Sequence, residues 1–152
     1  MPRQADEPRF ALRRLAVTYD LRMPLRKRVV VYVERGDGLL VFDHRDHPEA
    51  GTQVPAGGVD EGEELTEAAI REVREETGVR LDAELTLLGT HEHLDGLGRP
   101  ALSYFFRADA PDGLPTSWQH VVSGNGEDAA LVFECRFERA PRLWAVQAVF
   151  LR

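Results

Sequence analysis

Three glutamates in one short helical segment are the residues of this chain best suited to chemistry. Glu72, Glu75 and Glu76 lie in Leu65–Thr77, where the spacing of apolar residues predicts an α-helix. At about 100° per residue, Glu72 and Glu76 fall on the stripe that the apolar residues turn toward the core. Two like charges four residues apart repel each other, and burial makes leaving them unpaired more costly. We therefore expect a positive charge beside them.

The positive charge could come from either of two sources. Arg71 and Arg74 of the same segment could neutralise the glutamates, or the segment could lie on the surface with only a weak apolar stripe. The other source is a divalent cation, because carboxylate oxygens are the hard ligands that Mg²⁺ and Mn²⁺ prefer. The pattern of residues by itself leaves both interpretations open.

The stretch around these glutamates resembles the Nudix box, the signature of the MutT-like diphosphohydrolases. Every specified position of that signature is filled, and Pro55 stands upstream where the family usually has a proline. The resemblance implies an α/β fold, the Nudix-type α/β/α sandwich with a mixed β-sheet, and a hydrolase that cleaves a diphosphate linkage. The matching positions are Gly57, Glu63, Arg71, Glu72, Val73, Glu75, Glu76, Gly78 and Val79.

The resemblance also implies a role for the matching residues. Glu72, Glu75 and Glu76 would hold one or more divalent ions, Mg²⁺ or Mn²⁺, together with the backbone carbonyl of Ala56. The residues implied to support the site, by orienting its loop and its helix, are Glu63, Arg71, Gly57 and Gly78.

Two positions depart from the usual family pattern. Ala56 stands where Gly is more common, but a carbonyl ligand needs no particular side chain, so the site survives if Ala56 can adopt the required backbone angles. Gln53 stands where an aromatic residue is frequent, which argues against a base-stacking role at that position.

The implied reaction is attack of water on one phosphorus of a diphosphate, with metal ions neutralising the phosphate oxygens. The base could be Glu72, or it could come from residues 109–129, a Pro- and Gly-rich stretch expected to form a long loop. Glu127 is the leading carboxylate of that loop and Asp128 the second. The alternative for each is a solvated loop charge.

Three further residues are candidate substrate contacts. Arg45 could meet phosphate, and its alternative is a place in a solvated loop. Trp118 and His120 could stack on a base, whereas the alternative for Trp118 is to cover the edge of the core.

The elements that must position these residues are visible as apolar runs. Val29–Val33 and Leu39–Phe42 predict a hairpin, and because both of its faces are apolar we expect a sheet covered on both sides. Residues 85–94 and 101–108 predict a second hairpin, residues 131–137 a late strand, and residues 142–151 a terminal helix with Leu143, Trp144, Val146 and Phe150 inward.

Length and charge limit the remaining possibilities. The 152 residues suit one domain, which we assign to residues 29–152, and residues 1–28 are left without an assignment. The net charge is −7, but residues 1–28 carry eight basic and three acidic residues, a net +5, so residues 29–152 carry −12. That balance argues against binding a nucleic acid polymer, and a phosphate substrate would need a cation. The chain has no membrane-spanning apolar run and no signal-peptide pattern, so we expect a cytoplasmic protein.

The sequence therefore predicts a metal-dependent hydrolase of a small-molecule nucleoside diphosphate derivative, which could be a nucleotide, a nucleotide sugar or a dinucleotide. The alternative is a non-catalytic Nudix-like domain that senses a nucleotide or mediates an interaction. The sequence does not decide the particular diphosphate, and it leaves a homodimer open.

Overall fold

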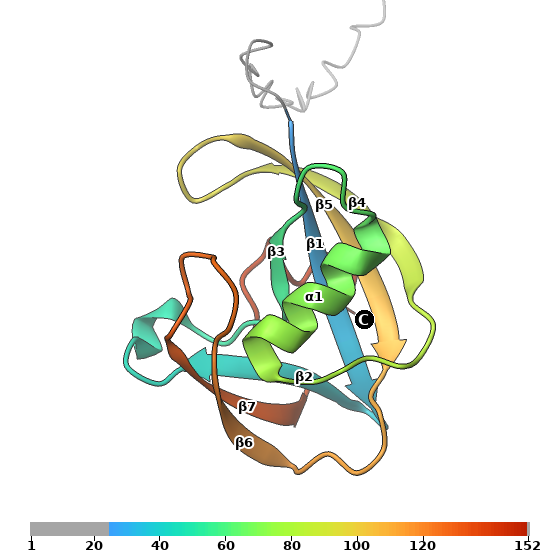
Figure 1. Ribbon diagram of the computed structural model, residues 1–152, viewed down its shortest axis with the longest axis vertical. Helices are drawn as coiled ribbons and strands as arrows, with labels where there is room; N and C mark the ends of the chain where they lie inside the picture. Colours follow the sequence, from blue (N-terminus) through green and yellow to red (C-terminus); the bar gives the residue numbers. More distant parts are fainter. Residues whose placement is uncertain (1–24, 152) are drawn as a thin grey trace, which may run out of the picture.

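The computed structural model of the protein describes residues 25–151, and residues 1–24 and 152 lie outside the described part. Most of the segment left without an assignment above is therefore not described, although its last residues belong to the first strand. The described chain folds into a seven-stranded mixed sheet with one α-helix lying across it (Figure 1). The elements are β1 (Arg26–Arg35), β2 (Gly38–His44), a 3₁₀ turn (Pro48–Ala50), β3 (Ala56–Gly58), α1 (Leu65–Thr77), β4 (Thr86–Leu94), β5 (Pro100–Asp109), β6 (Ser117–Val121) and β7 (Val132–Arg139).

The strands are ordered β4-β5-β1-β2-β7-β6, with β3 paired to β1 off this path. Strands β1 and β5 run parallel, and the other pairs are antiparallel. Both predicted hairpins and the late strand are confirmed, with β1 beginning at Arg26, three residues before the predicted Val29.

A short segment leading to β3 is inserted between the first two strands. Strands β1 and β2 pair only near their shared turn, through Glu34 with Leu39 and Arg35 with Gly38. Beyond that turn, residues 53–58 pair with both strands, since Gln53 bridges to Phe42 of β2 and β3 pairs with β1. This insertion brings the chain just before α1 to the middle of the sheet.

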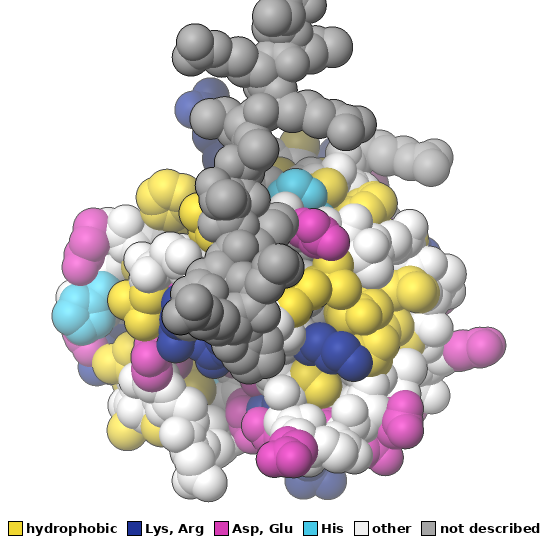
Figure 2. Space-filling view, turned by 90° about the horizontal axis from the view of Figure 1, so that it is seen from above, with side chains coloured by type: hydrophobic (Ala, Val, Ile, Leu, Met, Phe, Trp, Pro, Cys, Tyr) yellow, Lys and Arg dark blue, Asp and Glu magenta, His cyan; other side chains and the backbone are white. Residues whose placement is uncertain are grey.

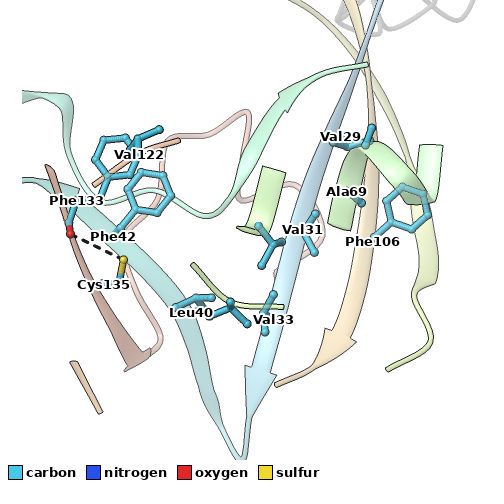
Figure 3. Packing of buried hydrophobic residues seen from close by; sticks show 13 residues of the cluster. Val29, Val31, Val33, Leu40, Phe42, Ala69, Phe106, Val122, Phe133 and Cys135 are labelled. Carbon is cyan, nitrogen blue, oxygen red and sulfur yellow. Dashed lines mark hydrogen bonds between the residues drawn. The ribbon is translucent and has the colours of Figure 1, made fainter. Parts of the chain in front are cut away.

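Apolar side chains cover both faces of the sheet, as the double-sided apolar runs predict. On the face under α1, Val29, Val31 and Val33 pack with residues of β2, β7 and the helix (Figure 3). On the other face, Val30 and Tyr32 pack with Phe105 and with residues of the C-terminal segment 141–151. The alternation of side chains along β1 therefore feeds two separate cores.

Two predictions from sequence are wrong. Residues 142–151 form turns instead of a helix, and although Leu143 and Phe150 pack on the second core, Trp144 and Val146 are exposed. Local bonds, such as that from the N–H of Gln147 to the carbonyl of Trp144, close single turns, and Tyr32 Oη of β1 donates to the carbonyl of Gln147. Residues 109–129 are also not one long loop, because they contain β6, which pairs with β7.

Among the described residues, no helix is long and apolar enough to cross a membrane.

Candidate active site

Helix α1 carries the three glutamates and begins and ends where the sequence predicts. At its start, Glu64 and Glu67 exchange side-chain and backbone hydrogen bonds in a capping box. At its end, Gly78 adopts a left-handed backbone with φ 76°, a conformation that glycine reaches without steric cost. These two ends set the length of the helix, and packing of Ala68, Ala69 and Val73 in the core turns its apolar stripe toward the sheet.

Glu76 lies on this inward stripe and is almost completely buried, with a relative exposure of 7%. Its Oε1 accepts a hydrogen bond of 2.8 Å from the backbone N–H of Ala56. Among the described residues, no cationic side chain forms a hydrogen bond or ion pair with it. Burial and the charge of Glu72 raise the pKa of Glu76 well above its ordinary value, and the bond from Ala56 only partly opposes this.

Arg71 partly neutralises the cluster, although helical geometry places it on the far side from Glu76. Its guanidinium binds Glu63 through two bonds of 2.8 and 2.9 Å and donates to Glu72 at 2.8 Å. It also donates to the carbonyl of Gly58 at 2.8 Å and to Glu75 at 3.3 Å. The salt-bridge interpretation therefore holds for Glu72 and Glu75, and it does not extend to Glu76.

Glu72 remains difficult to ionise despite this bond. Its side chain is 12% exposed, and burial raises its pKa to about 7 even though Arg71 acts to lower it. Two carboxyl groups with raised pKa values thus face the same region. Perturbed carboxyls of this kind are typical of a functional site.

Gly57 leaves room for the Glu72 carboxyl, which lies directly against it. A Cβ at this position would come within 2.1 Å of the Glu72 carboxyl carbon. The neighbouring Ala56 has no left-handed backbone, so alanine is accommodated there without strain. The departure from glycine at position 56 is therefore compatible with the local geometry.

The glutamates line a cavity of about 630 Å³, in which residues distant in sequence come together. The predicted loop carboxylates Glu127 and Asp128 both line it, and the charge of Asp128 contributes to the raised pKa of Glu76. Three arginines that the sequence analysis did not select also line it, namely Arg26, Arg28 and Arg99. For Arg26 and Arg28, the sequence offered one indication of a role, namely the positive net charge of residues 1–28.

The three predicted substrate contacts do not line this cavity. Arg45 lies on the loop after β2 and pairs with its neighbour Asp46. Trp118 and His120 lie on strand β6, which corrects their expected place in a loop, and they bond to the carbonyls of Thr77 and Glu75 at the end of α1. They satisfy carbonyls that the end of a helix leaves without partners.

A divalent ion fits the chemistry of the glutamates, although the carboxyl groups do not already converge on one point. Within residues 25–151, no three His, Cys, Asp or Glu side chains stand at metal-binding spacing. Glu72 is instead bonded to Arg71, and Glu76 is bonded only to a neutral N–H. Carboxylate oxygens are suitable ligands, and a cation beside the two carboxyls would favour their ionised forms.

Comparison with known proteins places this site in a family. A family model of the NUDIX domain matches residues 24–150. The chain belongs to the Nudix family. The resemblance carried by the glutamate helix is thereby confirmed, as is the α/β fold with a mixed sheet. Nudix hydrolases generally use divalent metals.

Curated relatives match only part of the chain. An RNA pyrophosphohydrolase of Cereibacter sphaeroides is 43% identical over 60 residues, which are 39% of this chain and 37% of that protein. An RNA pyrophosphohydrolase of Sphingopyxis alaskensis is 36% identical over 95 residues, which are 61% of this chain and 52% of that protein. The chain thus spans about half, or less, of the length of these relatives.

Solved structures share the fold. A MutT NUDIX hydrolase from Burkholderia pseudomallei is 30% identical, with a TM-score of 0.52, and the match covers 61% of this chain and 73% of that one. A UDP-X diphosphatase has a TM-score of 0.60 over 82% of this chain and 57% of that one. At 17% identity the second structure supports the fold alone.

Proposed function

We propose that this Nudix protein is a pyrophosphohydrolase that cleaves the diphosphate linkage of a nucleoside diphosphate derivative by attack of water at phosphorus. A divalent cation, Mg²⁺ or Mn²⁺, would be held by Glu72, Glu75 and Glu76 together with the carbonyl of Ala56. When bound, the cation would neutralise phosphate oxygens and favour ionisation of a water molecule.

The observation that carries the proposal is the state of Glu76. Ionising a carboxyl group that is 7% exposed and hydrogen-bonded to one neutral N–H costs free energy. Glu72 lies close enough to raise its pKa further. A fold that needed only a structural contact here would be served by a neutral side chain, so the acid is best explained by a cationic ligand.

The other residues of the box organise this position. Arg71 joins Glu63 and Gly58 of the preceding segment to the helix, which ties the turn after β3 to the glutamates. Glu63 also accepts a hydrogen bond from the N–H of Asp60, which closes the turn. These bonds hold the backbone of Ala56 and Gly57 against the carboxyl groups.

A carboxylate from the loop after β6 is a second candidate for the base. Both Glu127 and Asp128 line the cavity, and the charge of Asp128 contributes to the raised pKa of Glu76. The loop is attached to the helix by a hydrogen bond of 3.0 Å from the N–H of Ser123 to the carbonyl of Glu75. We therefore propose Asp128 ahead of Glu127 as the loop carboxylate that activates water.

The names of the relatives bear on the substrate. Those reported above are RNA pyrophosphohydrolases, so an RNA end that carries a diphosphate linkage joins the small nucleotides as a candidate. The sequence-based expectation of no nucleic acid polymer thus stays a prediction, and the substrate screen has to include RNA.

The test is a screen of the purified protein against nucleoside triphosphates, nucleotide sugars, dinucleotides and 5′-triphosphate RNA, with Mg²⁺ and with excess chelator. We expect turnover of at least one substrate only with the metal, and its loss in Glu76→Gln. Glu84→Gln is the matched control, because Glu84 is exposed before β4 and does not line the cavity. Binding of a nucleotide without any turnover would instead support the sensor.

A further inference from the structure

The C-terminal segment, residues 141–151, lies on the face of the sheet opposite the glutamate helix. In Figure 1, α1 lies in front of the sheet and this segment passes behind it. Its Leu143 and Phe150 pack on the second core, which includes Val54 and Tyr32 and is joined by Ala56. The segment therefore contacts, from behind the sheet, the stretch of chain that leads to the glutamates.

Two side chains of this segment bind the backbone of residues 50–54. The indole Nε1 of Trp144 donates to the carbonyl of Ala50 at 2.7 Å. The Oε1 of Gln147 accepts the N–H of Val54 at 2.9 Å, and the Nε2 of Gln147 donates to the carbonyl of Val54 over a longer 3.5 Å. Because a side-chain amide carries both a donor and an acceptor, Gln147 pairs with Val54 as a peptide group of a neighbouring strand would.

Val54 depends on this amide because it is closed to bulk solvent. Seen from the end where β1 begins, hydrophobic, acidic and basic side chains are interspersed on the surface (Figure 2). Val54 lies inside the molecule and is completely buried. Its neighbour Gln53 bonds to Phe42 of β2, and the carbonyl of Pro55 accepts the N–H of Val31 of β1, whereas Val54 bonds to Gln147. A buried backbone N–H that loses its partner is destabilised, because bulk water cannot replace the bond.

Pro55 makes a stiff link between Val54 and Ala56. Its ring fixes its φ angle, and its carbonyl is held by a 2.9 Å bond from the N–H of Val31. The N–H of Ala56 donates to Glu76, and the carbonyl of Ala56 is the backbone ligand in the proposed metal site. A shift of Val54 would therefore move both of the groups with which Ala56 serves the site.

Tyr32 fixes the backbone that carries Gln147. Its hydroxyl donates to the carbonyl of Gln147 and accepts the N–H of Phe150 at 3.3 Å. Tyr32 is buried and belongs to β1, the strand with which β3 pairs. The sheet therefore holds Gln147 in place from its own central strand.

We propose that Gln147 is a positioning residue of the active site, which acts through Val54 and Pro55 to hold the backbone of Ala56 against Glu76 and the metal. The inference rests on the proposed function, because the metal is what requires a fixed position of the Ala56 carbonyl. It extends the site to the far face of the sheet, to a residue outside the Nudix box. Replacing a residue that orients a metal ligand typically weakens metal binding by about 10- to 100-fold.

The first test measures the affinity for Mn²⁺ by calorimetry, without substrate and at a temperature where every variant is folded. Gln147→Leu keeps a side chain of similar size without its two hydrogen bonds, and we expect it to raise the Kd for Mn²⁺ by about tenfold. At saturating Mg²⁺ we expect kcat to change by less than about twofold, because a higher concentration restores the bound ion. Leu143→Ala is the matched control: it removes an apolar contact of the same segment, so it should lower Tm while the Kd changes by less than about twofold.

Three results would overturn the positioning role. Equal Kd values in wild type and Gln147→Leu would show that the amide does not act on the metal site. An equal rise of the Kd in Leu143→Ala would mean that the stability of the segment sets the affinity. An equal rise in Trp144→Phe, which loses only the bond to Ala50, would assign the effect to anchoring of the whole segment and not to Gln147.

Amide hydrogen exchange in excess chelator separates failure of this inference from failure of the proposed function. In Gln147→Leu we expect the N–H of Ala56 to exchange about tenfold faster than in wild type, because its backbone is released. The N–H of Phe42 is the internal reference, since its bond to Gln53 does not involve Gln147, and its exchange should change much less.

The exchange rates have a definite meaning for each proposal. If no protein binds Mn²⁺ or turns over a substrate, and Ala56 still exchanges faster in Gln147→Leu, the proposed function fails and Gln147 remains the residue that positions Ala56. If Ala56 exchanges as in wild type, or if Ala56 and Phe42 are accelerated equally, the positioning role is refuted whatever the turnover.

Discussion

Replacing Glu76 by Gln separates the charge of this side chain from its shape. Gln is nearly isosteric, and its carbonyl oxygen can still accept the 2.8 Å bond from the N–H of Ala56. The substitution removes one buried negative charge next to Glu72. If this charge is present for a cation, the metal-free protein should gain stability from the change while the enzyme loses activity.

The magnitude follows from the environment of Glu76. For each unit by which burial raises the pKa of Glu76, the folded protein with a charged carboxylate is destabilised by about 1.4 kcal/mol. This cost accrues only up to the pH of the assay. The amide NH₂ of Gln returns about 1 kcal/mol of that gain if it finds no acceptor. We expect the metal-free variant to be more stable than wild type by about 1 to 3 kcal/mol, or about 3 to 10 °C in Tm.

The pH dependence has a definite sign. Because the pKa of Glu76 is raised in the folded state, the folded protein binds more protons than the unfolded chain above the ordinary pKa. In acid, Glu76 is protonated in both states and does not destabilise the folded protein. As the pH rises from the ordinary pKa toward the raised pKa, the free energy of unfolding falls. In chelator, wild type should therefore lose more stability than Glu76→Gln between pH 5.5 and pH 8.

Added metal should reverse or close the gap. Wild type gains RT ln(1 + [Mg²⁺]/Kd), about 1 to 3 kcal/mol when the ion is well above its Kd, and the variant gains less. Melting curves of both proteins in chelator and in millimolar Mg²⁺, at both pH values, measure the effect. Glu84→Gln should behave like wild type throughout. A Glu76→Gln variant clearly less stable than wild type in chelator at pH 8 would show that the charge has a structural cationic partner, and the metal argument would be refuted.

Further outcomes are expected elsewhere in the chain. Excess chelator should abolish turnover and Mg²⁺ should restore it; undiminished turnover in chelator would contradict a metal-dependent reaction. Asp128→Asn should lower kcat by about 10²-fold, and Glu127→Gln should do so less; equal, unchanged rates would remove the loop from base catalysis. Gln147→Ala should lower Tm by about 3 to 8 °C, since the Gln147 amide pairs with both backbone groups of Val54; an unchanged melting curve would show that the C-terminal segment does not support residues 53–58. Burial raises the pKa of the Cys135 thiol to about 12, so the folded protein should resist thiol reagents at pH 8, and labelling should follow unfolding in urea.

Local patterns in the sequence were sufficient to predict the bounds of the helix and the inward orientation of two of its carboxyl groups. The apolar spacing predicted α1 from Leu65 to Thr77, and the same periodicity turned Glu72 and Glu76 inward. The turn composition between two apolar runs predicted the first hairpin. These features depend on contacts between residues a few positions apart, so a short window of sequence contains the forces that produce them.

Periodicity alone misjudged elements whose partners are distant. Residues 142–151 have apolar residues at spacings suited to a helix, but Tyr32 and Val54 bond to the groups of Gln147 and hold the segment across the sheet in turns. Strand β6 was not predicted, because it lies in a Pro- and Gly-rich stretch. It forms because β7 supplies hydrogen-bond partners along its length. In both cases a long-range contact decides the conformation of a segment whose own preferences are weak.

The sequence by itself predicted a helix at Leu65–Thr77 whose periodicity turns Glu72 and Glu76 toward the core. Only the tertiary structure decided which other charges surround it. Arg28 and Arg99 are far apart in the chain, and they reach one cavity because β1 pairs with β5 in parallel. Parallel pairing joins segments separated by a long connection, and no local spacing records which residues it will bring together. The arginines that line the cavity beside the glutamates are therefore brought there by the sheet's topology, whereas the glutamates' orientation is a property of the helix.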